Sequence, residues 1–358
     1  LEIPTIIYNN AEEALNLQLF DPEIRPLIKE LFLEKYPSVV ALHALDAGDV
    51  SKTLGYTALR LIPGETLPKH RRIYQLSPQD VKYMEELLEQ FIRFNYVIRA
   101  PVESNDLHLY GMSTYMVPRK KLTEIPRLVI DFSPLTSIIQ SPPSFVPDIA
   151  ASLQQLQGKA IFSSMDLKYA YLALKIDEKS RPLTQFFTPT GAYQWASIPT
   201  GASCSVPFFI DAVNRILHYE PVLDKNGDPV YESENKVKLR RDVLENSFHY
   251  FDDIICGSGL KKTYEETLKG HFNDLELIIR RLAFHNVKIS VNKSEFNKTK
   301  ILFLGWIVSH DFIIPDPRRM EKIERAVFPT TKKEMRSFIG LVNSIRRVVP
   351  FDVIKEIQ

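Results

Sequence analysis

Two adjacent acidic residues interrupt an apolar stretch in the second half of the chain. The stretch covers residues 250–255 and reads Tyr-Phe-Asp-Asp-Ile-Ile, and its other members are typical of a buried β-hairpin. Burying one unpaired carboxylate is strongly unfavourable, and two adjacent carboxylates also repel each other. Asp252 and Asp253 are therefore expected either to bind divalent cations or to form a solvated turn at the tip of the hairpin.

A third acid, Asp166, ends another apolar stretch that is predicted to be a strand, residues 160–165. Neighbouring strands lie about 4.8 Å apart, so packing this strand beside the hairpin tip would bring three carboxylates together. Two Mg²⁺ ions roughly 3.5–4 Å apart need such a set of hard oxygen ligands, and Mn²⁺ could replace them. The sequence therefore predicts a site for two Mg²⁺ ions at Asp166, Asp252 and Asp253.

The elements that position these acids follow from apolar spacing and from helix-capping residues. Ser77, Pro78 and Asp80 form a strong helix start. Helices and strands are mixed without a regular βαβ alternation, so the predicted fold class is α+β. Predicted strands cover residues 112–118, 127–132, 287–291 and 301–308, and predicted helices cover residues 208–217 and 263–284 and begin again near residue 331.

Composition and charge limit the class of protein. Hydrophobic residues make up 44% and charged residues 25%, which excludes a mostly disordered chain. No apolar run approaches the roughly 18 residues of a membrane span, so no membrane partner is expected. Two cysteines predict no disulfide framework and favour a reducing compartment. Residues 260–350 hold 18 basic against 10 acidic residues, a balance of +8, which favours phosphate binding, although solvated helix faces would also explain it.

An ordered series of motifs resembles the reverse transcriptases of gypsy-type long-terminal-repeat retrotransposons and, more distantly, the retroviral enzymes. The resemblance covers about residues 74–347. It rests on a helix start (residues 74–78), a basic fingers strand (127–132), a first catalytic segment (165–171), a Pro-x-Gly segment (198–201), the Tyr-Phe-Asp-Asp signature (250–253), a primer-grip turn (303–309) and a stretch at the start of the thumb (328–341).

The resemblance implies a right-hand polymerase with fingers and palm subdomains and a partial thumb. Residues 1–72 are expected to form an N-terminal helical extension. The fingers would comprise residues 73–141 and 174–206, and the palm residues 142–173 and 207–310, with a polar insertion at 220–247 as a surface hairpin. Residues 311–358 would start the thumb. A chain that begins with Leu1 and leaves no room for a ribonuclease H domain suggests a piece of a longer polyprotein.

The resemblance also implies roles for individual residues. The three aspartates would be catalytic and bind the metal ions, with the Leu167 carbonyl as a further ligand. Tyr171 would exclude a ribose 2′-hydroxyl, or be core packing only. The implied ligands of the triphosphate are Arg127 together with Lys120 or Arg119, unless these residues form a solvated loop, and Lys293 is implied for the leaving pyrophosphate. Leu304, Gly305 and Trp306 would bind the primer.

The implied function is RNA- and DNA-templated DNA synthesis from deoxynucleotides (dNTPs) on a primed RNA or DNA template. Two alternatives stay open: a palm polymerase that uses ribonucleotides, and a retired or domesticated nucleic-acid-binding scaffold with the same fold. A second polymerase or ribonuclease H chain from the same polyprotein is an expected partner. The expected location is a virus-like particle in the cytoplasm, with a nuclear stage at integration.

Overall fold

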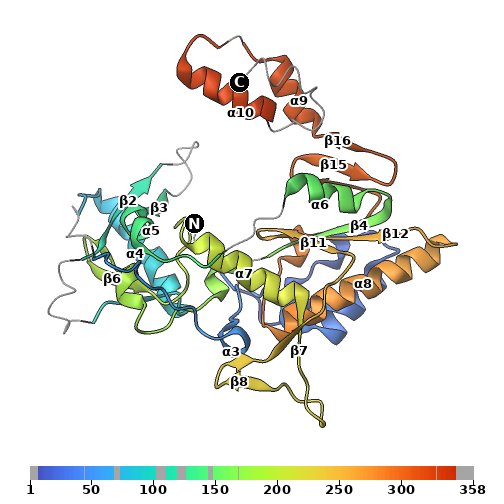
Figure 1. The fold of residues 1–358 in the computed structure, drawn as a ribbon, viewed down its shortest axis with the longest axis horizontal. Coiled ribbons are helices and arrows are strands. Elements are labelled where there is room, and N and C mark those ends of the chain that lie inside the picture. Colours follow the sequence, from blue (N-terminus) through green and yellow to red (C-terminus); the bar gives the residue numbers. More distant parts are fainter. Residues whose placement is uncertain are drawn as a thin grey trace.

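The computed structural model describes most of the chain as two lobes with a third, smaller part above them (Figure 1). The described residues are 7–43, 45–67, 73–101, 110–118, 126–143, 148–167, 169–327 and 329–343. One lobe holds a sheet of five strands and the other a sheet of four strands. In the described ranges, no helix is long and apolar enough to cross a lipid bilayer.

The first lobe contains the five-stranded sheet, in the order β1-β6-β5-β2-β3. Helix α4 packs on it and begins as predicted, with the Ser77 side chain accepting a hydrogen bond from the Asp80 amide. The Phe91 ring of α4 lies 5.8 Å from the Trp195 ring of β6, centroid to centroid, which anchors helix to sheet. The elements are α4 (Pro78–Arg93), β1 (Val97–Arg99), β2 (Met112–Val117), β3 (Arg127–Ile130), α5 (Ser133–Ile138), β5 (Phe186–Thr188) and β6 (Gly191–Trp195).

The second lobe contains the four-stranded sheet, in the order β11-β12-β4-β13. Side chains alternate along β4, so Phe162 packs with Trp306 on one face while Met165 packs with the α8 side on the other. Helix α6 lies above this sheet and α8 below it (Figure 1). The elements are α6 (Ile149–Leu156), β4 (Lys159–Asp166), α7 (Ser205–His218), β11 (Ser247–Tyr250), β12 (Asp253–Gly259), α8 (Tyr264–Phe284) and β13 (Glu295–Lys298).

A three-stranded antiparallel sheet, β14-β15-β16, follows the second lobe and leads to the last two helices. These strands are β14 (Lys300–Phe303), β15 (Trp306–Ser309) and β16 (Ile313–Pro315), and the helices are α9 (Pro317–Glu324) and α10 (Lys332–Asn343). The predicted boundary between palm and thumb at residue 310 falls inside this sheet, between β15 and β16.

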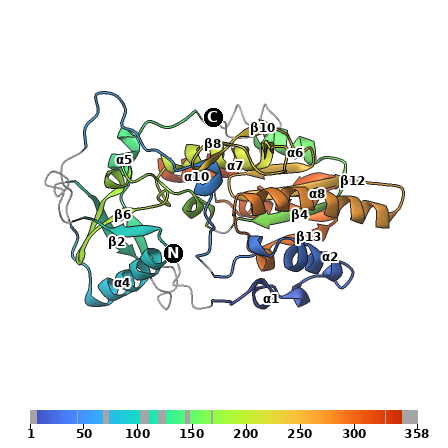
Figure 2. The ribbon, with the colours of Figure 1, turned by 90° about the horizontal axis from the view of Figure 1, so that it is seen from below.

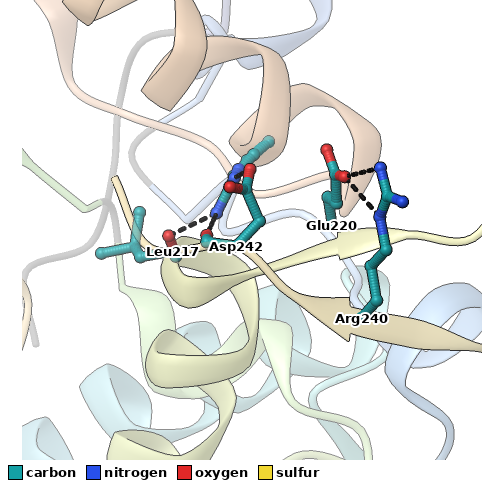
Figure 3. A network of polar contacts seen from close by, with 5 residues as sticks. Leu217, Glu220, Arg240 and Asp242 are labelled. Atoms are coloured by element: carbon teal, nitrogen blue, oxygen red, sulfur yellow. Dashed lines mark hydrogen bonds and ion pairs between the residues drawn. The ribbon is translucent and has the colours of Figure 1, made fainter. Parts of the chain in front are cut away.

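The polar insertion forms two small two-stranded sheets beside the C-terminal end of α7. The pairs are β7 (Tyr219–Pro221) with β10 (Leu239–Arg241), and β8 (Tyr231–Ser233) with β9 (Lys236–Val237). Figure 3 shows the base of the insertion, where Arg240 pairs with Glu220 across β7 and β10. The buried Arg281 of α8 donates to the carbonyl oxygens of Leu217, at 2.5 Å, and Asp242, at 2.7 Å, and therefore links α7, α8 and the insertion.

The N-terminal segment is built from short helices and runs along the second lobe beside α8 and β13 (Figure 2). The Phe20 ring packs against the Phe296 ring of β13, with centroids 5.7 Å apart. Asn292 holds the segment in place, because its side-chain amide donates to the Ala14 carbonyl oxygen at 2.7 Å. The helices are α1 (Ala11–Ala14), η1 (Leu17–Leu19), α2 (Arg25–Lys29), η2 (Glu30–Lys35), η3 (Pro37–Val39) and α3 (Ser51–Leu54).

Two predicted strands are wrong as regular strands: residues 301–308 form the β14–β15 hairpin instead of one strand, and residues 287–291 form no regular strand. Val287 and Ile289 make only isolated bridges, to Gly48 and to both Val40 and Leu167, and residues from Val291 form the short helix η7 (Val291–Lys293). Alternate partners on two sides satisfy this backbone, so no continuous ladder forms.

Candidate active site

The two adjacent aspartates lie at the tip of the β11–β12 hairpin. Tyr250 pairs with Asp253 across the hairpin, so Phe251 and Asp252 form the two-residue turn. Phe251 has φ of 55°, a left-handed conformation that a bulky residue rarely adopts. Strained backbone of this kind clusters at functional sites, where the surrounding structure holds it in place. The turn therefore fixes where Asp252 lies relative to Asp253.

The third aspartate lies directly opposite the hairpin tip on the neighbouring strand. Asp166, the last residue of β4, pairs in register with Asp253, the first residue of β12. The Leu167 amide donates to the Asp252 carbonyl oxygen at 3.3 Å, and the Ser290 amide donates to the Asp166 carbonyl oxygen at 3.0 Å. Backbone hydrogen bonds therefore hold Asp166, Leu167, Asp252 and Asp253 together, as the sequence predicted.

The alternation of the sheet places Asp166 and Asp253 on the same face. Ile254 and Met165, one residue inward on each strand, belong to the core on the α8 side, whereas Ile255 belongs to the cluster on the opposite face. Since residues paired across antiparallel strands point to one side, both carboxylates leave the sheet on the face of Ile255. That face also carries the β14–β15 hairpin, whose Trp306 packs in the same cluster.

The carboxylates concentrate negative charge at this tip. Partial burial raises the pKa of Asp253, and the nearby carboxylates of Asp252 and Asp166 raise it further. Carboxylate and carbonyl oxygens are the ligands that Mg²⁺ prefers, so the donor set fits a hard divalent cation, which would also offset this repulsion. Within the described part of the chain, however, no three His, Cys, Asp or Glu side chains already form a metal-binding group. The backbones are thus adjacent, but the ligand cage is not preformed.

Tyr171 lies beside the acidic tip on a hydrophobic support. Its ring stacks on Phe209 of α7, with centroids 4.2 Å apart and planes 19° from parallel. The ring is half-buried, and its phenol pKa is raised first by burial and then by the Asp252 carboxylate. Tyr171 therefore packs on the core next to the acids, and its role toward the ribose stays a prediction.

Two predicted nucleotide ligands, Arg127 and Lys293, lie on elements other than the two strands that carry the acids. Arg127 is exposed at the start of β3, on the five-stranded sheet of the other lobe. Lys293 is exposed at the end of η7, two residues before β13, which pairs with β4. Arg119 and Lys120 lie outside the described residues. Their roles stay predictions.

The predicted primer-grip residues form the tight turn between β14 and β15. Leu304 and Gly305 have φ of 52° and 79°, as a two-residue hairpin turn requires, while Trp306 is buried at 4% exposure. The Gly305 carbonyl oxygen accepts from the Asp316 amide at 3.0 Å, which ties the turn to the start of α9. A Cβ atom on Gly305 would lie 1.8 Å from the Arg319 guanidinium carbon, so a larger residue here would displace that side chain and would also have to adopt the φ of 79°.

Two supporting residues were missed by the sequence analysis. Phe209, under Tyr171, is one of many buried apolar residues and carried no distinguishing signal. His271 is fully buried in α8 between Leu268, Phe272 and Leu275 on the apolar side of the helix. A histidine on an apolar helix stripe could have indicated a buried polar contact, but its partners are far away in the sequence.

Known proteins resemble the chain in sequence. Residues 111–308 match the family described as "Reverse transcriptase (RNA-dependent DNA polymerase)". A retrovirus-related Pol polyprotein from transposon 297 of Drosophila melanogaster is 29% identical over 244 residues, which cover 67% of this chain and 20% of that polyprotein. The transposon Tf2-3 polyprotein of Schizosaccharomyces pombe is 26% identical over 279 residues, 78% of this chain and 18% of its own length. The chain therefore spans about a fifth of these relatives.

Solved structures resemble the chain in fold. A foamy viral protease-reverse transcriptase in complex with double-stranded DNA has a TM-score of 0.72 and 19% identity, and the match covers 94% of this chain and 52% of that one. The same kind of protein in complex with an RNA/DNA hybrid has a TM-score of 0.68 and 20% identity, covering 94% and 40% of the two chains. The predicted α+β polymerase fold is thereby confirmed.

Proposed function

Because this chain belongs to the reverse transcriptase (RNA-dependent DNA polymerase) family, we propose that it synthesises DNA on RNA and DNA templates. The observation that carries the proposal is the register of the four-stranded sheet β11-β12-β4-β13, called the palm sheet below. This register sets Asp166 directly opposite Asp253 and next to Asp252. Three acids from two separate parts of the sequence share one edge of this sheet, where their charges repel each other. Negative charge that destabilises a site is expected to have a function.

In the proposed reaction a primer 3′-hydroxyl attacks the α-phosphate of a dNTP and pyrophosphate leaves. Asp166, Asp252 and Asp253, with the Leu167 carbonyl, would hold two Mg²⁺ ions, or Mn²⁺ in their place. Such ions lower the pKa of a bound hydroxyl and offset charge on the leaving phosphate oxygens. The chain's own contribution is the rigid backbone of the two strands, which keeps the carboxylates on one face for in-line attack.

Residues around the acids would select and orient the nucleotide. We assign Tyr171 to exclusion of the ribose 2′-hydroxyl, because Phe209 holds its ring beside the acidic tip. Arg127, with Lys120 or Arg119, would bind the triphosphate, since arginine makes bidentate contacts with phosphate oxygens. Lys293 would protonate the leaving pyrophosphate.

The experiment is primer extension on poly(rA) annealed to oligo(dT), with dTTP and Mg²⁺. Wild type is compared with Asp252→Asn and with the matched control Asp311→Asn, which removes one charge from the exposed turn between β15 and β16. We expect extension by wild type and the control and none by Asp252→Asn. Extension by Asp252→Asn would remove Asp252 from the site.

Two other functions give different results in this assay. A retired or domesticated scaffold would bind the primer–template but show no Mg²⁺-dependent extension in any of the three proteins. A ribonucleotide polymerase would accept UTP as well as dTTP, and its choice would not change in Tyr171→Ala. We expect wild type to prefer dTTP and Tyr171→Ala to accept UTP more readily.

The partners that follow from this function are a primed RNA or DNA template and dNTPs. A ribonuclease H chain or a second polymerase chain from the same polyprotein is a further proposed partner, since the relatives are polyproteins of much greater length. The proposed location, a cytoplasmic virus-like particle with a nuclear stage, rests on the family alone.

A further inference from the structure

A buried polar chain crosses the underside of the palm sheet, on the face away from the acids. His271 of α8 lies between two serines, with its Nε2 atom 2.7 Å from the Ser163 hydroxyl of β4 and its Nδ1 atom 2.8 Å from the Ser258 hydroxyl of β12. The exposed fractions of His271, Ser163 and Ser258 are 0%, 0% and 4%. One side chain therefore joins the two strands that carry Asp166 and Asp253.

The donor and the acceptor of each hydrogen bond in this network follow from the fact that the Asp274 carboxylate can only accept. The Ser258 hydroxyl lies 2.6 Å from a carboxylate oxygen of Asp274, which can only accept, so Ser258 donates its one hydrogen there. Ser258 must then accept from His271, whose Nδ1 carries the hydrogen. The Nε2 atom is consequently the acceptor in a neutral ring, and Ser163 donates to it.

The hydrogen-bond network around His271 continues at both of its ends into neighbouring elements. The Ser163 oxygen accepts from the Asn297 amide of β13 at 3.2 Å, so a third strand is attached. At the other end, Asn246 donates to Asp274 at 2.9 Å and accepts from Lys159 of β4 at 2.7 Å. Every link has a donor and an acceptor, which is the condition under which a buried polar network specifies one arrangement.

Burial keeps the His271 ring neutral. Burial lowers its pKa to about 4, although the Asp274 carboxylate opposes this shift. Lys159 is connected only through Asn246 and Asp274, and the Cys256 thiol lies 3.9 Å from Nδ1. At neutral pH the ring therefore keeps one donor and one acceptor, so Ser163 still donates to Nε2 and Nδ1 still donates to Ser258.

The Ser163–His271–Ser258 hydrogen bonds fix the register between β4 and β12. This register decides which residue lies opposite Asp166. A slip of one residue moves every side chain of a strand to the other face of the sheet. If β4 slipped against β12, either Ser163 or Ser258 would leave His271, and Asp166 would no longer lie opposite Asp253. The same hydrogen bonds that satisfy His271 thus exclude the arrangement in which the carboxylates are separated.

We propose that His271 is a positioning residue for nucleotidyl transfer: its two hydrogen bonds, to Ser163 and Ser258, lock β4 to β12 so that Asp166 and Asp253 bind metal ions together. This inference rests on the proposed function of the three acids. His271 itself touches neither the substrate nor the metal ions. This role differs from a purely stabilising one, because loss of these hydrogen bonds should weaken metal binding.

The test compares two mild variants, Ser163→Ala and Ser258→Ala, with the control Ser180→Ala. Ser180 is also buried and hydrogen-bonded, to the backbone of Leu59, but lies away from the palm sheet. Mn²⁺ binding to the protein without nucleic acid is measured by electron paramagnetic resonance, and urea unfolding gives the stability. Primer extension then gives the Mg²⁺ dependence, kcat and the dTTP KM separately.

We expect all three variants to lose some stability. Only Ser163→Ala and Ser258→Ala, the palm variants, should bind Mn²⁺ more weakly, by about tenfold, as when a residue that supports metal ligands is removed. They should need more Mg²⁺ and have a lower kcat with an unchanged dTTP KM. His271→Gln, which keeps a donor and an acceptor, should bind Mn²⁺ better than His271→Leu. Palm variants that bind Mn²⁺ like wild type and Ser180→Ala would overturn the inference.

Failure of the proposed function gives a different pattern. If wild type extends no primer, the function is wrong, but the Mn²⁺ comparison still tests the inference, which stands if the palm variants bind more weakly and falls if they do not. If wild type extends primers and the palm variants do so with the same Mg²⁺ dependence, the function stands and the inference falls.

Discussion

Replacing Asp253 by asparagine should stabilise the protein while it abolishes DNA synthesis. In the folded chain Asp253 is opposite Asp166 and beside Asp252, and both raise its pKa together with partial burial. Like charges held together by the fold are further apart in the unfolded chain, so removing one charge favours folding. An amide of nearly the same size keeps the shape of the hairpin tip.

The magnitude follows from the register of the sheet. Side chains directly opposite each other are about 5 Å apart. Two unit charges at that distance repel by roughly 3 kcal/mol at an effective dielectric constant of about 20, and by about 0.8 kcal/mol in water. Asp253 is exposed, which favours the lower end, so we expect a gain of about 1 kcal/mol in the free energy of unfolding.

The assay is urea unfolding with EDTA and again with Mg²⁺, for wild type, Asp253→Asn and the control Asp311→Asn. With EDTA, Asp253→Asn should be the most stable of the three. A ligand that binds only the folded state adds stability, so Mg²⁺ should stabilise wild type and the control more than Asp253→Asn. The advantage of the variant should therefore shrink or reverse when Mg²⁺ is added.

The pH dependence gives an independent check of the sign. A carboxyl group whose pKa is raised in the folded state binds protons more tightly there, so wild type gains stability as the pH falls through that pKa. The advantage of Asp253→Asn should thus be largest at neutral pH and disappear toward the ordinary aspartate pKa of about 3.9. A variant less stable than wild type in EDTA at neutral pH would refute the electrostatic argument.

Three further predictions concern residues away from the acidic tip. Arg127→Ala should raise the dNTP KM more than the primer–template Kd, and the opposite result in extension and binding assays would place Arg127 on the template strand. Gly305→Ala should lower the free energy of unfolding by about 1–2 kcal/mol, because φ is 79° there, and weaken primer–template binding in fluorescence anisotropy. Arg281→Leu should lower the free energy of unfolding by about 2–3 kcal/mol in urea, since two backbone carbonyl groups lose a charged donor; a change near zero would mean that water replaces it.

The main elements of both lobes could be predicted because local signals and burial agree there. The Ser77 cap and the apolar stripe that follows predict α4, and the apolar runs before Asp166 and around Asp252 predict β4 and the β11–β12 hairpin. The prediction of a strand from Val287 to Val291 failed for the opposite reason. Its apolar alternation reflects partners on two sides, which are the N-terminal segment and Leu167 just after β4, and no local signal reveals them.

The acids of the site could be predicted, but the parts that hold them could not. Asp166, Asp252 and Asp253 conflict with their apolar surroundings, and such a conflict is visible in a sequence. The register that sets Asp166 opposite Asp253 depends on long-range pairing and appears only in the fold. The contacts of His271 with Ser163 and Ser258 are likewise invisible, since the residues that it joins are 108 and 13 positions away.

The attachment of the N-terminal segment has a consequence for how the chain folds during synthesis. The Ala14 carbonyl oxygen is bound by Asn292, 278 residues later in the sequence. At a translation rate of about 5–20 residues per second, this partner leaves the ribosome roughly 15–55 s after Ala14. Ile28 and Phe32, fully buried in the finished fold, must stay exposed or shielded by a chaperone during that time. The order of synthesis therefore makes the N-terminal segment a late-docking part of the protein, whose apolar residues are open to aggregation while the chain grows.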